Sequence, residues 1–199
     1  MVVVKIGGSL QSTKYIRYWI KAVKLNRNTS FLLVFGGGKY ADEIRRQQKI
    51  KLYSDYEAHK NAVNAMKSFT KDYSNELKDF LYIKSVDSIK KNYKVRKLLT
   101  WLPSVNEVDK LNIPLDWNAT SDSIALAIAK KTNSPLIIVK SLKFNSKKYM
   151  NSFFLKDQIL DKYFSDNYKL HDQKISITSR DKFYKLKKIC KDFSRNINY

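Results

Sequence analysis

The sequence predicts an α/β protein with a largely parallel sheet that helices cover on both faces. Short apolar runs alternate along the chain with amphipathic patterns of helical period, which is the arrangement of α/β folds. Two of these runs, "FLLVF" and "PLIIVK", are continuously apolar, as is typical of strands buried on both faces. A length of 199 residues and 43% apolar content suit one domain with a substantial core.

Five short apolar runs are predicted to be strands, and amphipathic helices are predicted between them. The strands cover residues 2–6, 31–35, 97–102, 135–140 and 174–178. The helices carry their apolar positions within residues 15–23, 41–44, 62–80, 120–131 and 183–193. Ser12 and Thr13 are candidate caps of the first helix. The mostly polar stretch 143–152 is predicted to be an exposed loop.

The net charge of +21 is the unusual property of the composition. It suits a nucleic acid, an anionic membrane or an anionic small substrate. Only seven of the 39 basic residues are Arg, however, and bidentate recognition of phosphates and bases favours Arg over Lys. The sequence therefore favours a lysine-rich solvated surface, and a nucleic-acid partner is the less favoured explanation.

The composition also bears on location and metals. The N-terminus lacks the long apolar segment of a signal peptide, and no stretch approaches the length of a membrane span, so we expect a cytoplasmic protein without a membrane partner. With Cys190 as the single cysteine and two histidines, neither an internal disulfide nor a structural zinc site is expected.

All five glycines lie in two clusters, each at the end of a predicted strand. They stand in "VKIGGSL" (residues 4–10) and "FGGGKY" (residues 35–40). Alone, the first cluster is explained by a tight turn between a strand and a helix. Two such loops at the carboxyl edge of one parallel sheet, each leading into a helix, favour a site for two anionic partners close together.

A third segment, "WNATSDSIALAIAKK", opens a predicted helix with Thr120, Ser121 and Asp122. A helix cap with an acid placed for the helix dipole explains it in isolation. Alternatively, Asp122 lies opposite Lys5 and holds that lysine while it neutralises the charge of a phosphoryl group.

Together, "VKIGGSL", "FGGGKYADEIRR" and "TSDSIALAIAK" resemble the signatures of the amino acid kinase superfamily, in the same order and at fitting separations. The most similar branch is the small archaeal-type kinase of aminomethylfuranylmethyl phosphate, a methanofuran precursor. That similarity includes "AHKNAVNAM" around His59 and "DWNATSDS" around Trp117, and it covers roughly residues 1–140.

The resemblance implies a three-layer αβα sandwich that forms a single domain over residues 1–199. About residues 1–118 would form an acceptor-side lobe, and about residues 119–199 a nucleotide-side lobe that diverges after residue 140. It further implies ATP as the phosphoryl donor, Mg²⁺ carried by the nucleotide without a metal site on the protein, a small anionic substrate, and a homo-oligomer.

The resemblance also implies roles for individual residues. Lys5 would stabilise the transferring phosphoryl group, and Asp122 would orient Lys5 and a second lysine. The nucleotide phosphates would be bound by Gly7, Gly8 and Ser9. The acceptor would be bound by Gly36, Gly37, Gly38, His59, Thr120 and Ser121, with a plain helix-surface position as the alternative for His59.

The sequence departs from the family after the strand "PLIIV". Where members commonly carry a "TDVDG"-like turn, this chain has "KSLKF", without the acids and the glycine. Either ATP binds through altered contacts, with Lys140 or Lys143 at its phosphates, or the nucleotide site has decayed. Lys169 is the candidate for the family's second catalytic lysine.

Lys5 and Asp122 together favour the enzyme, because a pure scaffold has no need of this pair. We therefore expect an ATP-dependent kinase that transfers the γ-phosphoryl group to a small anionic acceptor, a phosphate monoester. The resemblance to the most similar branch implies a role in the biosynthesis of a one-carbon carrier. The alternative is a catalytically degenerate protein that binds a small anion or serves as a partner subunit. A nucleic-acid binder, whose affinity would fall steeply with salt, comes third.

Overall fold

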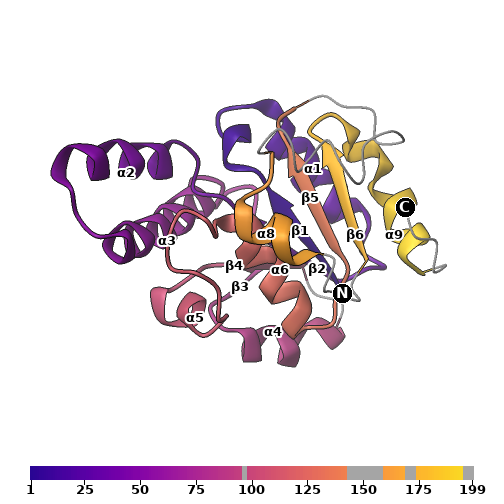
Figure 1. Ribbon diagram of the computed structural model, residues 1–199. Helices are drawn as coiled ribbons and strands as arrows, with labels where there is room; N and C mark the ends of the chain where they lie inside the picture. Colours follow the sequence, from indigo (N-terminus) through magenta and orange to yellow (C-terminus); the bar gives the residue numbers. More distant parts are fainter. Residues whose placement is uncertain (96–97, 143–158, 169–173, 195–199) are drawn as a thin grey trace.

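Six parallel strands form the central sheet in the computed structural model, which describes residues 1–95, 98–142, 159–168 and 174–194. The strand order is β3-β4-β2-β1-β5-β6, and every neighbouring pair is parallel (Figure 1). The bounds are Val2–Ile6 for β1, Phe31–Phe35 for β2, Leu81–Ile83 for β3, Leu98–Trp101 for β4, Leu136–Lys140 for β5 and Ile175–Ser179 for β6.

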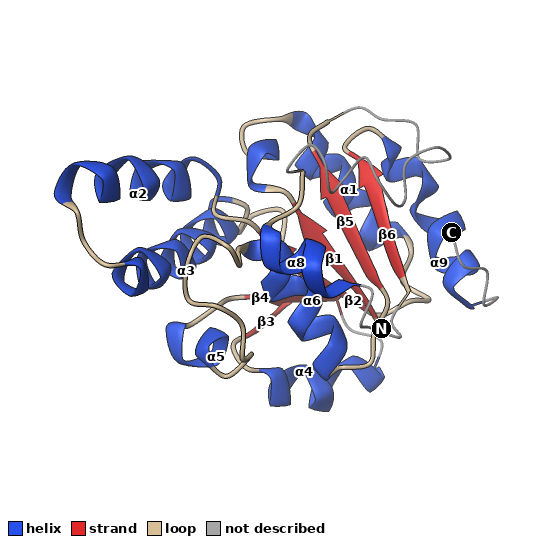
Figure 2. Cartoon of the chain, in the orientation of Figure 1, coloured by secondary structure: helices blue, strands red, loops and turns tan. Residues whose placement is uncertain are grey.

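Helices lie on both faces of this sheet (Figure 2). The α-helices are α1 Lys14–Leu25, α2 Gly38–Lys51, α3 Asp55–Asp72, α4 Val86–Asn92, α5 Val105–Asp109, α6 Ser121–Lys131, α8 Lys162–Asn167 and α9 Leu186–Ser194. Short 3-10 helices cover η1 Gly8–Leu10, η2 Tyr93–Val95 and η4 Lys182–Lys185. None of the described helices is long and apolar enough to cross a bilayer.

Two apolar cores, one on each face of the sheet, hold the layers together. Trp19 of α1 and Phe193 of α9 pack with Val4 of β1 on one face. Ile124 of α6 and Phe164 of α8 pack on the other face. The predicted α/β class and its three αβα layers are confirmed.

Helix α2 extends away from the sheet and lies against α3 (Figure 1). Its buried residues are Gly38 and Ala41, both at its first turns, so most of the helix is solvated. Because α3 carries buried residues along much of its length, α3 anchors this pair of helices to the body of the protein.

The prediction of a helix that continues to Phe80 was wrong, because α3 ends at Asp72. Tyr73, Leu77 and Phe80 are still buried, but they lie in successive turns, one of which is closed by the Leu77 N–H donating to the Tyr73 carbonyl at 2.9 Å. These turns bury residues three or four apart, as a helix does, so the apolar spacing gave no sign of the helix end.

Several short elements were not predicted: strand β3 and the helices α4, α5 and α8. The strand has three residues, of which only Ile83 is buried, so no apolar run marks it. The five predicted strands are confirmed within one or two residues at their ends. The predicted loop 143–152 lies outside the described residues, as do Lys143 and Lys169.

Candidate active site

The order in which the chain adds strands to the sheet reverses between β1 and β5. From β1 the chain proceeds to β2 on one side, whereas β5 leads to β6 on the other side. Open α/β sheets bind ligands at such a point, outside the carboxyl ends of the strands. Lys5 lies one residue before the end of β1, and Lys140 is the last residue of β5. The fold therefore places two lysines at its expected ligand position.

The alternation of side chains along a strand directs both lysines to the same face of the sheet. Val4 packs on the α1 face, so Lys5 shares the opposite face with Val3. Lys140 continues the series of Leu136 and Ile138, which also pack on this second face. Since α6 covers this face, its first turn comes to lie over the two lysines.

Asp122, in that first turn, bridges the two lysines. The Lys5 Nζ lies 2.7 Å from Asp122 Oδ1, and the Lys140 Nζ lies 2.5 Å from Asp122 Oδ2. The Lys5 and Asp122 side chains are each 4% exposed, and that of Lys140 is 13% exposed. The helix dipole explains an acid in this turn, but it does not explain a carboxylate shared by two buried cations.

The charges of this triad are strongly coupled. Burial alone would raise the pKa of the Asp122 carboxyl, but Lys140 and Lys5 outweigh it and hold the pKa at about 2. Burial lowers the pKa of Lys5; the Asp122 carboxylate opposes this shift, and the Lys140 charge adds to it. One carboxylate thus carries two cations, which leaves a net positive charge available for an anionic ligand.

The two glycine loops touch each other beside the triad. A Cβ atom on Gly8 would lie 2.6 Å from the backbone N of Gly38, and one on Gly36 would lie 2.7 Å from the backbone N of Gly8. Only glycine permits this approach. The first turn of α2 is therefore held directly against the loop that follows β1.

Not all of the predicted loop amides face a ligand. The Gly7 N–H donates to the Val139 carbonyl and the Gly36 N–H to the Ile6 carbonyl, each at 3.0 Å, so both amides extend the sheet. Gly7 and Gly36 are therefore assigned to holding the loops in place. The loop residues that line the cavity are Gly8, Ser9, Gly37 and Gly38.

A cavity of about 920 Å³ opens from the triad. At the end formed by α2 and α3, the Arg45 guanidinium lies 4.3 Å from the ring centroid of Trp117. The Trp117 Nε1–H donates to Gln48 Oε1 at 2.6 Å, which fixes the indole. His59, Thr120 and Ser121 line the cavity. His59 is only 5% exposed, which rules out the helix-surface alternative.

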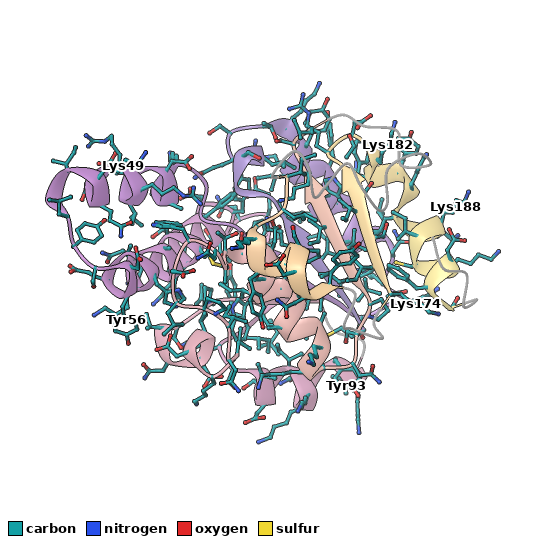
Figure 3. All side chains as sticks on the ribbon, viewed as in Figure 1. Lys49, Tyr56, Tyr93, Lys174, Lys182 and Lys188 are labelled. Carbon is teal, nitrogen blue, oxygen red and sulfur yellow. The ribbon has the colours of Figure 1, made fainter. Side chains whose placement is uncertain are left out.

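The cavity is of mixed charge and not strongly basic. The cationic side chains that line the cavity are Lys5, Arg45, Lys140 and Lys162, and the carboxylates are Asp42, Asp116, Asp122, Asp161 and Asp166. The excess of lysine is spread over the outer surface instead, as with the exposed Lys49 of α2 and Lys188 of α9 (Figure 3).

Asp161 is a site residue that the sequence analysis missed. Its Oδ2 accepts hydrogen bonds from the backbone N–H and the hydroxyl of Thr120, both at 2.8 Å, and its Oδ1 accepts from the Phe164 N–H at 2.9 Å. The Ser123 N–H and hydroxyl also donate to this carboxylate. Asp161 therefore caps both α6 and α8 and fixes the turn that carries Asp122. The position of an acid just before a short helix could have predicted the α8 cap. The contacts of Asp161 with α6 join residues distant in sequence, so no local pattern predicts them.

The described residues do not offer Mg²⁺ a protein-held site. Nowhere in the described ranges do three or more His, Cys, Asp or Glu side chains gather in a way that could hold a metal ion. Asp122 is occupied by two lysines, and Asp161 by hydrogen-bond donors of two helices. Neither carboxylate is therefore free to serve as a ligand of Mg²⁺.

Comparison with known proteins relates the chain to phosphoryl-transfer enzymes. A profile described as "Amino acid kinase family" matches residues 1–142. The [5-(aminomethyl)furan-3-yl]methyl phosphate kinase of Methanocaldococcus jannaschii is 29% identical over 143 residues, which are 70% of this chain and 64% of that protein. The chain thus matches somewhat less than two thirds of the length of this curated relative.

Solved structures share the fold at low sequence identity. The uridylate kinase of Archaeoglobus fulgidus superposes with a TM-score of 0.71 at 14% identity, over 94% of this chain and 95% of that one. The UMP kinase of Bacillus anthracis gives a TM-score of 0.65 at 13% identity, over 95% and 91% of the two chains. At this identity the likeness establishes the fold alone, and it extends beyond residue 142 into the part that the profile does not match.

Proposed function

Because the chain belongs to the amino acid kinase family, we propose that it is an ATP-dependent phosphotransferase that acts on a small phosphorylated acceptor. The observation that carries the proposal is the Lys5–Asp122–Lys140 triad beside two glycine loops in contact. Phosphoryl transfer requires chiefly in-line positioning and stabilisation of charge on the equatorial oxygens, which lysines and backbone N–H groups supply.

The roles of the triad follow from its charges. In the transfer, an acceptor oxygen forms a bond to the γ-phosphorus as the bond between the γ-phosphorus and the β,γ-bridging oxygen breaks, and ADP leaves. Lys5 and Lys140 neutralise the oxygens of the group in transit. Asp122 holds the ammonium groups of Lys5 and Lys140 at its two carboxylate oxygens, so that their positions relative to each other are fixed. Mg²⁺, bound to the nucleotide, supplies further neutralisation of phosphate charge.

Lys140 is proposed to serve as the second catalytic lysine, the role for which Lys169 is the candidate from the sequence. The turn "KSLKF" lacks the family's acids and glycine, but its first residue brings an ammonium group to Asp122. The altered turn is therefore compatible with catalysis, and Ser141 supports it by accepting a hydrogen bond from the Ser9 hydroxyl at 2.8 Å.

The acceptor is proposed to be a phosphate monoester that also carries a cationic group, as the aminomethyl compound in the name of the Methanocaldococcus relative does at neutral pH. The mixed charge of the cavity supports this class. Arg45 and His59 lie at the α2 and α3 end for a phosphate, and Asp116 lies there for an ammonium group. The similarity to the Methanocaldococcus relative also leads us to propose that the reaction belongs to the biosynthesis of a one-carbon carrier. We further propose that the protein forms a homo-oligomer.

The test is ³¹P NMR of the purified protein with MgATP and a panel of phosphate monoesters, including [5-(aminomethyl)furan-3-yl]methyl phosphate. The proposal requires a diphosphate product and ADP in equal amounts, and no product with Lys5→Ala protein that unfolds as cooperatively as the wild type. If ATP is neither bound nor consumed, the alternative holds: a kinase-like subunit whose nucleotide site has been lost, as the missing acids after β5 would favour.

A further inference from the structure

His59, which lines the α2 and α3 end of the cavity, has a buried ring nitrogen that faces a buried carboxylate oxygen without a hydrogen bond. The Nε2 of His59 on α3 lies 3.4 Å from the Oδ1 of Asp109, the last residue of α5. Neither atom has a hydrogen-bond partner in the described part of the chain. The separation exceeds that of an ordinary N–H···O hydrogen bond. A buried donor or acceptor left unpaired costs free energy, so the arrangement calls for an explanation.

The surroundings of His59 are charged on several sides. Asp109 approaches from α5, and its Oδ2 lies 3.5 Å from the hydroxyl of Tyr56, one helical turn before His59 on α3. Asp116 acts from the segment before α6, and Arg45 lines the same end of the cavity from α2. Lys162 and Asp166 of α8 line the cavity as well.

The free protein favours the neutral imidazole. Burial lowers the pKa of His59, and the Asp109 and Asp116 carboxylates oppose this shift without cancelling it. A phosphate bound in the cavity would add a negative charge near His59, in addition to the Asp116 carboxylate that lines the same cavity. Opposite charges within about 4–6 Å favour the charged form of histidine. Binding of an anion should therefore shift His59 from the neutral imidazole towards the imidazolium.

We propose that Asp109 is a positioning residue for His59, and that the pair takes up one proton when the phosphate of the acceptor binds. The imidazolium then donates from Nε2 to Asp109 and presents its positive charge to the phosphate. This proposal rests on the proposed function for the identity of the acceptor. It adds a second cationic group beside Arg45 at the α2 and α3 end of the cavity, and this group is charged only when the acceptor is present.

The chain is well suited to a direct test, because it contains only two histidines, His59 and His171. The imidazole Cε1–H signals are followed by NMR against pH, and they are assigned with His59→Gln and His171→Gln protein. Titrations are run with 50 mM inorganic phosphate or with chloride at equal ionic strength. We expect phosphate to raise the titration midpoint of His59 by about half a pH unit or more, and Asp109→Asn to lower it by about one unit in chloride.

Matched variants separate positioning from packing. Asp109→Glu keeps the charge and should retain the phosphate-dependent shift, whereas Asp109→Asn should lose most of it. Tyr56→Phe removes the other contact of the carboxylate and should leave the shift in place. A His59 midpoint that is equal in phosphate and chloride overturns the proposal, and so does an Asp109→Asn protein with the wild-type shift.

The outcome is independent of turnover. If phosphate shifts His59 but no phosphate monoester yields product, the kinase function fails and the proton-linked anion contact stands. If product forms while the His59 midpoint ignores phosphate, the kinase stands and this inference fails.

Discussion

The ammonium group of Lys140 lies 2.5 Å from one oxygen of Asp122, while Lys5 holds the other oxygen at 2.7 Å. Lys140 belongs to β5 and Lys5 to β1, so a single carboxylate of α6 ties together the two strands between which the sheet changes direction. This arrangement joins the fold to the proposed chemistry.

Lys140→Ala should lower kcat by about 10²–10³, because one charged donor to the transferring phosphoryl group is lost. Steady-state kinetics with MgATP and the acceptor measure the effect. Lys24→Ala is the matched control: Lys24 also pairs with a carboxylate, that of Asp79 at 2.8 Å, but it does not line the cavity. Equal activity of the two variants would remove Lys140 from the mechanism.

Asp122→Asn should destabilise the protein by about 3 kcal/mol, because it leaves two poorly exposed ammonium groups without a counter-charge. Urea denaturation followed by circular dichroism gives the free energy of unfolding. The control is Asp79→Asn, at an ion pair whose carboxylate is 47% exposed, and it should cost less than about 1 kcal/mol. A silent Asp122→Asn would mean that the carboxylate serves only the helix end, where Asn substitutes well for Asp.

The same carboxylate should make stability depend on pH in the acid range. The pKa of Asp122 is about 2 in the folded protein and 3.8 as an ordinary value, so its contribution is complete above about pH 4 and is lost as the pH falls through 2. The difference corresponds to about 2 kcal/mol. Urea unfolding at pH 5 and pH 2.5 should show a smaller acid loss in Asp122→Asn than in the wild type, and identical losses would contradict this assignment.

Gly37→Ala should lower the stability of the fold, and a second substitution should reverse the effect. A Cβ on Gly37 would lie 2.4 Å from the Cβ of Ala41, one turn along α2, whereas its other neighbours lie at 3.6 Å. Overpacking of this kind costs about 1–3 kcal/mol. Gly37→Ala with Ala41→Gly removes the clash and should recover a higher melting temperature than Gly37→Ala alone. A double variant less stable than the single one would show that the first turn of α2 is constrained by more than this contact.

The sequence predicted the parts of the site that are local in the chain. The glycine clusters follow strands, and Asp122 opens a helix, so periodicity and turn chemistry located these residues in the fold, while the resemblance implied their roles. Alternation along β1 and β5 also directs Lys5 and Lys140 to one face, although the pairing of Lys140 with Asp122 appears only when β5 is placed beside β1.

The remaining features depend on contacts distant in sequence. Asp161 caps a helix that begins 40 residues earlier, and Asp109 meets His59 across two helices. The cavity is of mixed charge because acids converge there from α2, α6 and α8, while the lysines that dominate the composition stay on the outside. Composition reports the average surface and not the lining of one cavity, so the net charge of +21 gave no sign of the acids that line this cavity.

The most direct measurement of the central claim is calorimetric titration of the wild-type protein and Lys140→Ala with MgATP. We predict that the wild type binds MgATP with a dissociation constant below about 100 μM, which corresponds to a binding free energy of about 5.5 kcal/mol. In Lys140→Ala the dissociation constant should be at least about tenfold higher. Absence of binding to the wild type at millimolar MgATP would contradict the account, because a triad built to neutralise a transferring phosphoryl group would then have no donor to act on.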